Sequence, residues 1–378
     1  MFLSVLSALM DCPLNIQHST FTISLVIPIL PAMRRRDFNR LTPGLLAGAW
    51  LRPGEVPDTG EMAIRKFGGP ILPGMTVGLI TPGSAIREEQ LTQAVANVES
   101  LGLKPYYTEA IHAQYGYLAG TDAVRLQDLQ HHLGHPEVDL IWCIRGGYGC
   151  SRLLPQIPAE RWKKANKPIL GFSDITALHA ARWSEDKMPG LHGPVAGMEL
   201  TEYTREQLKS ILFNTGYPQI IPLAPADQTH TEDSVLPYTI HPGTATGRLV
   251  GGNLSLLAAL AGTPYEPDLT GGLLFLEDVG EKPYRIDRML TQLHQAYHLH
   301  RVAGIVLGNF ADCEASPEDR SLSLPETLNN QFSGLGVPVY YGFSFGHVAD
   351  ICTFPVGCRA TLDTQAATVT IHEPWFHL

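Results

Sequence analysis

Three residues of this sequence have the side chains that nucleophilic catalysis uses, and each stands at the end of an apolar stretch. Ser173 lies between an apolar segment and a helical pattern. Glu277 ends a second apolar run, and His347 follows a third through a glycine. A serine, a histidine that takes its proton and a carboxylate that holds the histidine form a hydrolytic set found on many unrelated folds. A serine in a strand-to-helix turn directs its hydroxyl into a cleft and the next backbone N–H toward an oxyanion.

Each of these residues also has a purely structural interpretation. The serine can cap the helix that follows it, and the Gly-x-Ser-x-Gly pattern is incomplete because Ile175 replaces its last glycine. Glu277 can pair with Arg285 or Arg288, and the histidine can be a loop residue. From these residues alone, both interpretations stay open.

A parallel sheet covered by helices is predicted to hold the serine. From residue 75 onward, short apolar strands alternate with helical patterns, which is typical of such a sheet. The apolar strand 138–144 runs into the loop 145–150, and the strand 168–171 runs into the loop 171–174. Because open α/β sheets build their sites at the carboxyl ends of parallel strands, both loops are expected at the site.

The pattern divides the chain into four parts. A stretch rich in Pro and Gly precedes the first strand, and the polar stretch 224–237 indicates a connection between two folded units. Apolar strands return in the second unit, at 272–276, 302–307 and 337–343. The predicted parts are a leader and linker (1–74), a domain that carries the nucleophile (75–205), a connection (206–242) and a domain that carries the Glu and the His (243–378).

Composition places the chain among globular proteins and narrows its partners. The 378 residues are 44% hydrophobic and 17% charged, which allows two domains. A formal net charge of -10 gives no broad basic surface, so nucleic acid is not expected as a partner. The apolar stretch 21–30 contains Pro28 and is too short to cross a bilayer, so no stable membrane span is expected.

Neither the cysteines nor the histidines indicate a metal site. The six cysteines include no Cys-x-x-Cys pair. The cluster of His131, His132 and His135 lies where a helical pattern ends at Gly134, and we interpret it as a solvated helix end in preference to a metal site.

The region before residue 52 contains a run that resembles an export signal. Residues 1–33 hold no Lys or Arg, which argues against a Sec-type signal. The run 34–40 has the sequence Arg-Arg-Arg-Asp-Phe-Asn-Arg and resembles a twin-arginine signal, with an apolar stretch (41–51) and a small-residue cleavage site (47–49) after it. Under this interpretation, translation starts at Met33 and the protein is exported to the periplasm. The alternative is a basic leader on a cytoplasmic protein.

Ordered motif blocks from residue 75 to the end of the chain resemble one family, the LD-carboxypeptidases or murein tetrapeptide carboxypeptidases. That family also includes the microcin C self-immunity peptidases. The first fifty residues lie outside the resemblance. The blocks are Val77-Gly78-Leu79-Ile80-Thr81-Pro82, Ala119-Gly120-Thr121, Arg145-Gly146-Gly147-Tyr148-Gly149, Ser151-Arg152-Leu153-Leu154, Gly171-Phe172-Ser173-Asp174, His192-Gly193-Pro194, Gly251-Gly252-Asn253-Leu254, Leu276-Glu277-Asp278, Pro283-Tyr284-Arg285-Ile286-Asp287-Arg288-Met289-Leu290 and Phe345-Gly346-His347.

The resemblance implies a role for each residue of the hydrolytic set. Ser173 would be the nucleophile, His347 the general base and then acid, and Glu277 the group that holds the imidazole. Backbone N–H groups of Asp174 and Gly147 would form the oxyanion hole. The implied fold class is α/β, with a Rossmann-like first domain and a smaller mixed, β-rich second domain, and the triad at their junction.

The implied reaction is hydrolysis of the L,D amide bond between meso-diaminopimelate or lysine and the terminal D-alanine of a murein tetrapeptide. It needs no metal or cofactor and would serve peptidoglycan recycling or remodelling. Family members suggest a homodimer. For the free carboxylate of D-alanine, the candidates are Arg145, with Gly146 and Tyr148 beside it, and backbone amides of the glycine-rich loop.

Three other functions stay open at this point. The same triad could act on peptidyl or aminoacyl nucleotides, as in the microcin-immunity branch. A protein of another class, which binds a wall peptide without cleaving it, would differ in releasing no D-alanine. An α/β-hydrolase esterase shares the order Ser, acid, His, but this sequence has no Gly-x-Ser-x-Gly and no His-Gly-Gly-Gly segment.

Overall fold

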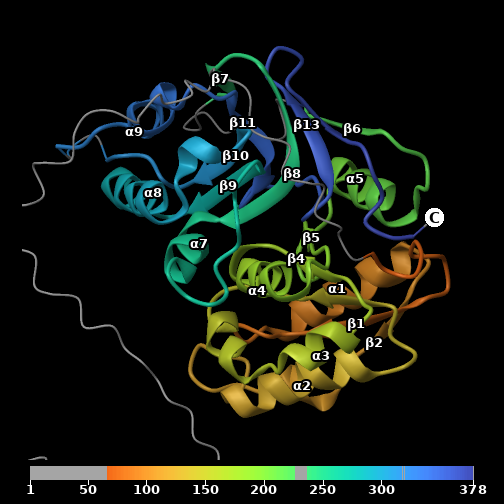
Figure 1. Cartoon of the computed structure of the whole chain (residues 1–378). Helices are drawn as coiled ribbons and strands as arrows, with labels where there is room; N and C mark the ends of the chain where they lie inside the picture. Colours follow the sequence, from red (N-terminus) through yellow and green to blue (C-terminus); the bar gives the residue numbers. More distant parts are fainter. Residues whose placement is uncertain (1–65, 226–235, 317, 319, 378) are drawn as a thin grey trace, which may run out of the picture. The chain divides into compact units, whose positions relative to one another are not determined.

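Two β-sheets and the helices that cover them make up the described part of the chain (Figure 1). The computed structural model describes residues 66–225, 236–316, 318 and 320–377. All of these lie in one compact unit, Pro53–Leu378. The strand order is β12-β5-β4-β3-β1-β2 in the first sheet and β6-β14-β13-β8-β9-β10-β11-β7 in the second.

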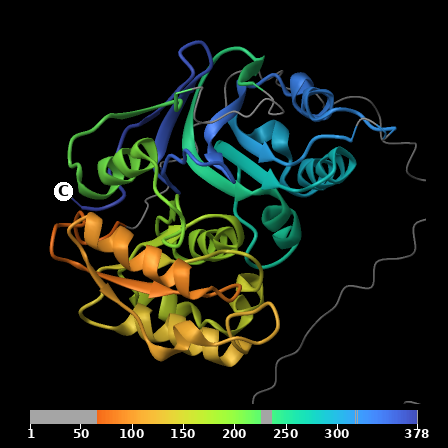
Figure 2. The ribbon, with the colours of Figure 1, turned by 180° about the vertical axis from the view of Figure 1, so that it is seen from behind.

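The first sheet is parallel except at one edge, where β12 pairs antiparallel with β5. All residues of β3 are buried, as expected for a strand covered on both faces. Helix α4 lies nearer the viewer in Figure 1 and α1 in Figure 2, so helices cover both faces. The elements are β1 (Thr76–Ile80), α1 (Glu88–Ser100), β2 (Lys104–Tyr106), α2 (Asp122–Gly134), β3 (Leu140–Cys143), α3 (Ala159–Lys164), β4 (Ile169–Gly171), α4 (Thr176–Asp186), β5 (Leu191–His192) and β12 (Phe354–Pro355).

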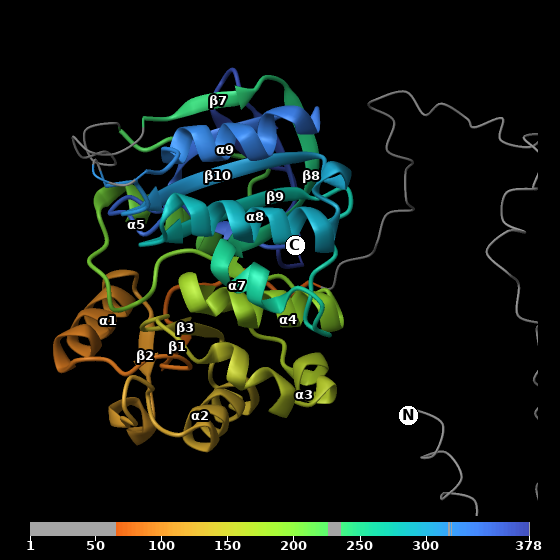
Figure 3. The same cartoon turned by 90° about the vertical axis from the view of Figure 1, so that its left-hand side faces the viewer.

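The second sheet is mixed. Strands β8, β9, β10 and β11 are parallel neighbours, whereas β7, β13, β14 and β6 pair antiparallel. Figure 3 shows α8 and α9 side by side over one face of this sheet. The elements are α5 (Glu202–Phe213), β6 (Gln219–Pro222), β7 (Tyr238–His241), β8 (Thr244–Asn253), α7 (Leu254–Leu260), β9 (Leu273–Val279), α8 (Pro283–Tyr297), β10 (Gly304–Ala311), α9 (Leu324–Phe332), β11 (Val339–Gly346), β13 (Arg359–Asp363) and β14 (Thr368–Ile371).

An aromatic core joins the two sheets. Phe354 of β12 lies in the first sheet, and its ring centroid is 5.4 Å from that of Phe275 and 5.1 Å from that of Phe345, both in the second sheet. All three side chains are fully buried. Since β12 follows β11 in the chain, the second half of the sequence completes the first sheet and closes this core.

The α/β fold class, with a parallel first sheet and a mixed second sheet, is confirmed. The second sheet has eight strands and the first six, although the second domain was expected to be the smaller. The stretch 206–242, expected as a connection, contains most of α5 together with β6 and β7, both paired in the second sheet. The predicted domain boundaries themselves stay predictions.

Two further expectations concern the surface. Helix α2 does end at Gly134, but only part of the histidine cluster is solvated: His132 is fully buried, and its Nδ1 lies 2.9 Å from the carbonyl oxygen of Asp128. His131 is exposed and its Nε2 lies 2.7 Å from the hydroxyl of Tyr106.

Within the described ranges, no helix is long and apolar enough to cross a membrane. The twin-arginine-like run lies outside the described residues.

Candidate active site

Ser173 occupies a strained turn between β4 and α4. Its backbone has φ 62°, a left-handed conformation that residues other than glycine rarely adopt. Such a conformation costs roughly 1–3 kcal/mol and persists where the surrounding structure enforces it. The serine Oγ lies 3.2 Å from Nε2 of His347, so this turn directs the hydroxyl at the imidazole.

The second sheet supplies the other two residues of the set. His347 Nδ1 lies 2.9 Å from Oε2 of Glu277. Glu277 is near the carboxyl end of β9 and is fully buried, while His347 directly follows β11. Strand β10 lies between β9 and β11 and runs parallel to both, so the two side chains emerge at the same edge of the sheet.

A glycine next to the histidine allows this close approach. Gly346 has φ 107°. A Cβ atom there would lie 2.8 Å from the carbonyl oxygen of Asn309 and 3.1 Å from Cβ of Glu277. Since real Cβ atoms do not come within 3.0 Å of other heavy atoms, only glycine fits between the acid and the strand beside it.

A direct hydrogen bond connects the nucleophile's segment to the second sheet. The backbone N–H of Asn253, at the end of β8, donates to Oγ1 of Thr176 at 3.0 Å. Asn253 also pairs in register with Glu277. Gly252 makes room for this contact, because a Cβ atom there would lie 2.5 Å from the same Oγ1. The two halves of the triad are thus tied together three residues away from Ser173.

The glycine-rich loop after β3 lies against the serine turn. A Cβ atom on Gly146 would lie 3.1 Å from the backbone N of Asp174 and 3.1 Å from Cβ of Ser173. Gly147 has φ 83°, and its Cα lies against Ser84. The backbone groups named for the oxyanion hole, Asp174 and Gly147, therefore belong to neighbouring segments.

The remaining candidates lie on the exposed side of this loop. Arg145 is exposed and donates from Nη1 to the carbonyl oxygen of Ala85 at 2.9 Å. The side chain of Tyr148 is 48% exposed, and its ring centroid is 5.8 Å from that of Tyr117. Both side chains are available to a ligand, and their roles stay predictions.

The structural alternative for Glu277 finds no support in the geometry. Arg285 donates to Glu281 on the surface at 3.3 Å, and the guanidinium of Arg288 lies 6.0 Å from the ring centroid of Tyr284. The partner that Glu277 has is His347.

Sequence reasoning assigned no role to several buried polar residues near the triad. Asp278 accepts hydrogen bonds from Asn253 Nδ2 at 3.1 Å and from Ser255 Oγ at 2.7 Å, while burial raises the pKa of its carboxyl. Asn253 and Asp278 belong to two of the family motif blocks, and that membership was the sequence signal for a role near the triad. Arg125 was missed because a helical pattern treats an arginine as solvent-facing, yet it is 2% exposed.

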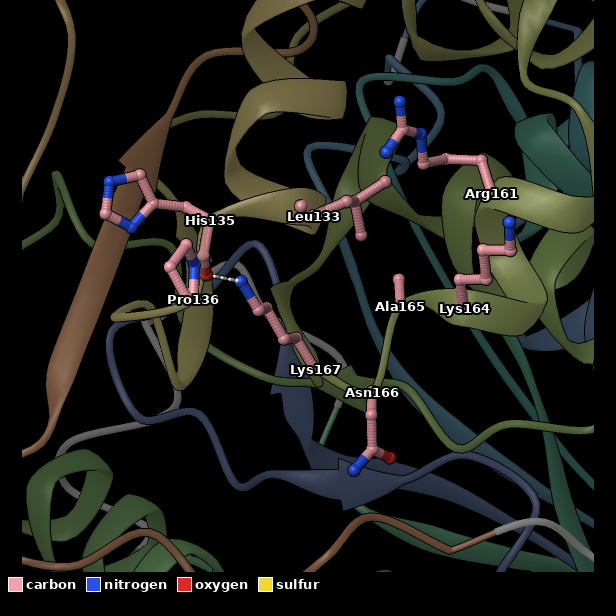
Figure 4. A pocket seen from close by; sticks show the side chains of 9 residues that line it. Leu133, His135, Pro136, Arg161, Lys164, Ala165, Asn166 and Lys167 are labelled. Carbon is pink, nitrogen blue, oxygen red and sulfur yellow. Dashed lines mark hydrogen bonds between the residues drawn. The ribbon is translucent and has the colours of Figure 1, made fainter.

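Two cavities lie in the described part of the chain without a triad residue in their walls. One, of about 360 Å³, is lined by basic side chains that include Arg161, Lys164 and Lys167 (Figure 4). It lies at the amino ends of β3 and β4, whereas Ser173 follows the carboxyl end of β4. There Lys167 donates to the carbonyl oxygens of His132 and His135, which end α2. The other, of about 540 Å³, lies at the start of α8 and is lined by Lys282, Arg285 and Arg320 among others.

Comparisons with known proteins bear on this arrangement. The LD-carboxypeptidase N-terminal domain profile matches residues 77–193, and the C-terminal domain profile matches residues 246–362. The murein tetrapeptide carboxypeptidase of Pseudomonas aeruginosa is 35% identical over 294 residues, which are 76% of this chain and 92% of that protein.

Solved structures give the same result. The crystal structure of muramoyltetrapeptide carboxypeptidase from Oxalobacter formigenes matches with TM-score 0.67 and 28% identity, over 79% of this chain and 99% of that one. The microcin C7 self-immunity protein MccF, in complex with aspartyl sulfamoyl adenosine, matches with TM-score 0.75 and covers 82% of this chain and 99% of its own. At 22% identity, the likeness to MccF shows a shared fold.

Fold and site together define an α/β hydrolytic enzyme of the serine type. The matches place it further: the chain belongs to the LD-carboxypeptidase family of serine peptidases. The resemblance seen in the motif blocks is confirmed.

Proposed function

We propose that this enzyme releases the terminal D-alanine from murein tetrapeptides by hydrolysing its amide bond to the L-centre of meso-diaminopimelate or lysine. The observation that carries the proposal is the continuous chain from Ser173 Oγ to His347 Nε2, at 3.2 Å, and from Nδ1 to Glu277 Oε2, at 2.9 Å. The relative from Pseudomonas aeruginosa, named a murein tetrapeptide carboxypeptidase, supports the substrate.

The geometry supports an acyl-enzyme mechanism. Glu277 accepts a hydrogen bond from the N–H of Nδ1, which keeps the proton on that nitrogen and leaves Nε2 of His347 free to accept the proton of Ser173. The serine oxygen then adds to the amide carbonyl, and the oxyanion lies near the backbone N–H groups of Asp174 and Gly147. Nε2 returns the proton to the nitrogen of D-alanine as the C–N bond breaks. A water activated by the same nitrogen hydrolyses the ester and releases the tripeptide.

The free carboxylate of the leaving D-alanine needs a cation or amide donors. We assign it to Arg145, which is exposed on the loop that lies against Ser173. Replacement of Arg145 by Met should then raise KM for tetrapeptide with little change in kcat. An unchanged KM would leave the carboxylate to backbone amides of the same loop.

A mass-spectrometric time course on a mixed muropeptide digest tests the bond and the substrate together. Tetrapeptide stems should lose D-alanine, and Ser173→Ala should abolish the loss while the protein stays folded. A parallel sample of a peptidyl adenylate tests the nucleotide alternative. Cleavage of the adenylate with intact tetrapeptide would replace the proposed substrate, and binding of tetrapeptide without any product would identify a binding protein.

We also propose export through the twin-arginine-like run and assembly as a homodimer. A chain expressed from Met33 should be shortened near Ala49 and appear in the periplasm, and Arg35→Lys with Arg36→Lys should hold it in the cytoplasm. Full-length protein found only in the cytoplasm would overturn this. For the dimer, light scattering should give twice the mass of the 41.3 kDa chain, less any segment removed.

A further inference from the structure

Two charged side chains outside the triad are buried behind the serine turn. Arg125, on α2, is 2% exposed, and Asp174, next to the nucleophile, is fully buried. A buried charge is costly unless it is paired and hydrogen-bonded, so both positions must have specific partners.

Arg125 joins two loops of the first sheet. One guanidinium nitrogen, Nη1, donates to the carbonyl oxygen of Pro82 in the loop after β1 and, at 2.9 Å, to that of Gly149 in the loop after β3. The other, Nη2, lies 2.5 Å from Oδ1 of Asp122, which also binds Arg152. The planar guanidinium thus pairs its charge with Asp122 through Nη2 and holds two backbone carbonyl groups through Nη1.

The carboxyl of Asp174 joins the serine turn to the same loop. Its Oδ2 accepts the backbone N–H of Cys150 at 2.8 Å, one residue after the carbonyl that Arg125 binds. Gly83 provides the space, because a Cβ atom there would lie 2.8 Å from this Oδ2 and 2.3 Å from the carbonyl oxygen of Gly146. The loops after β1, β3 and β4 thus meet around one carboxyl group.

Two glycines shape the loop after β3. Gly147 and Gly149 have φ 83° and 130°, so the chain after β3 passes twice through conformations that favour glycine. Ser84 adds two contacts to this loop: its N–H donates to the carbonyl oxygen of Gly146 at 3.0 Å, and its Oγ accepts the backbone N–H of Tyr148 at 3.1 Å. The position of the Gly147 N–H therefore depends on side chains from outside the loop.

We propose that Arg125 and the carboxyl of Asp174 are positioning residues that set the spacing between the backbone N–H groups of Asp174 and Gly147. The inference rests on the proposed function, in which these two groups bind the oxyanion. Donors stabilise an oxyanion only when they lie about 2.7–3.1 Å from it. A small displacement of the loop therefore weakens the binding of the transition state more than the binding of the substrate. Arg125 acts through Gly149, and Asp174 acts through Cys150.

The test compares Arg125→Lys with a matched control, Arg182→Lys. Arg182 is equally buried, and its guanidinium donates to the carbonyl oxygens of Ala165 and Lys167 at the amino end of β4, away from Ser173. In each variant, a lysine keeps the charge but cannot reproduce the planar guanidinium. Asp174→Asn is the second test variant, because it keeps the volume and removes the charge.

For each protein, kcat and KM on tetrapeptide, the melting temperature and two affinities should be measured. One affinity is for the tripeptide product and the other for a phosphonate analogue with a tetrahedral anionic centre. Arg125→Lys and Asp174→Asn should lower kcat about tenfold or more, since one oxyanion donor is worth roughly 10²–10³. Both variants should weaken phosphonate binding by a similar factor. KM and the affinity for the tripeptide should stay within about twofold of the wild-type values.

Arg182→Lys should lower the melting temperature and keep both kcat and phosphonate affinity in the folded protein. Equal losses of phosphonate and tripeptide affinity in the test variants, or unchanged kcat, would overturn the inference. If Arg125→Lys does not fold, Asp174→Asn decides by the same criteria. Failure of the wild-type enzyme to release D-alanine would refute the proposed function. This result is distinct from the outcomes above, which compare the variants with an active wild type.

Discussion

Replacement of Glu277 by Gln should remove most of the turnover and leave the fold in place. The carboxylate is fully buried, and its Oε2 is 2.9 Å from Nδ1 of His347. An amide of the same volume presents either oxygen or NH₂ to the ring. Oxygen keeps the hydrogen bond without the charge. NH₂ requires the other tautomer, with the proton on Nε2, so that the ring can no longer accept the proton of Ser173.

The magnitude follows from the charge that is lost. When His347 takes the serine proton, the imidazolium and the carboxylate face each other with charge centres about 4 Å apart, worth about 4 kcal/mol at an effective dielectric constant near 20. That corresponds to roughly a thousandfold in rate, and the wrong tautomer adds to the loss. Because the volume is conserved, the free energy of unfolding should change by less than about 1.5 kcal/mol.

The assay measures D-alanine release and thermal melting on the same preparations of wild type, Glu277→Gln and Glu281→Gln. Glu281 is four residues further on, with a side chain 27% exposed and paired to Arg285 at 3.3 Å. Its variant should keep normal turnover. The reasoning fails if Glu277→Gln works within about threefold of wild type. It also fails if the variant loses much stability while its folded fraction stays active, as a structural carboxylate would require.

Three further outcomes are expected. Burial lowers the pKa of His179 to about 4, so between about pH 6.5 and 4 the unfolded chain holds a proton that the folded chain lacks, and stability falls by about 3 kcal/mol as pH drops through that range. Urea unfolding should show this slope, and His179→Gln should reduce it; an equal slope in the variant would refute the assignment. Gly346→Ala should lower the melting temperature and remove most of the turnover, because a Cβ atom there would collide with Asn309 and crowd Glu277. Normal activity in this variant would show that a glycine is not needed beside Glu277. Incubation with EDTA should leave the rate unchanged, and a loss that zinc restores would indicate a metallopeptidase.

Several parts of this site could be predicted from local sequence. Apolar strands followed by a lone polar residue placed Ser173, Glu277 and His347 at strand ends, and the parallel-sheet rule placed the loops 145–150 and 171–174 together at one edge of the first sheet. The motif blocks then selected one family among hydrolases with the same order of residues. The structure brings the three side chains within hydrogen-bonding distance of one another.

Long-range pairing is the part that local patterns could not provide. The return of β12 to the first sheet depends on two residues, and β6 and β7 join the second sheet from a stretch that looked like a connection. Strands this short have little periodicity of their own, and their pairing is decided by the surfaces they cover. The buried Arg125 and His132 were missed for a related reason, since helical periodicity assigns polar residues to solvent unless their partners are known.

The division of the triad between two sheets makes catalysis depend on how those sheets pack. Ser173 belongs to the first sheet, and its distance of 3.2 Å to His347 crosses to the second. The ring of Phe172 lies 4.9 Å from that of His347, and the hydrogen bond from Asn253 to Thr176 crosses the same boundary. A shift of about 1 Å between the sheets would break the serine–histidine contact while each sheet kept its own hydrogen bonds. The aromatic core and the returning strand β12 join the two sheets, so we expect them to help hold this distance, which neither sheet can fix alone.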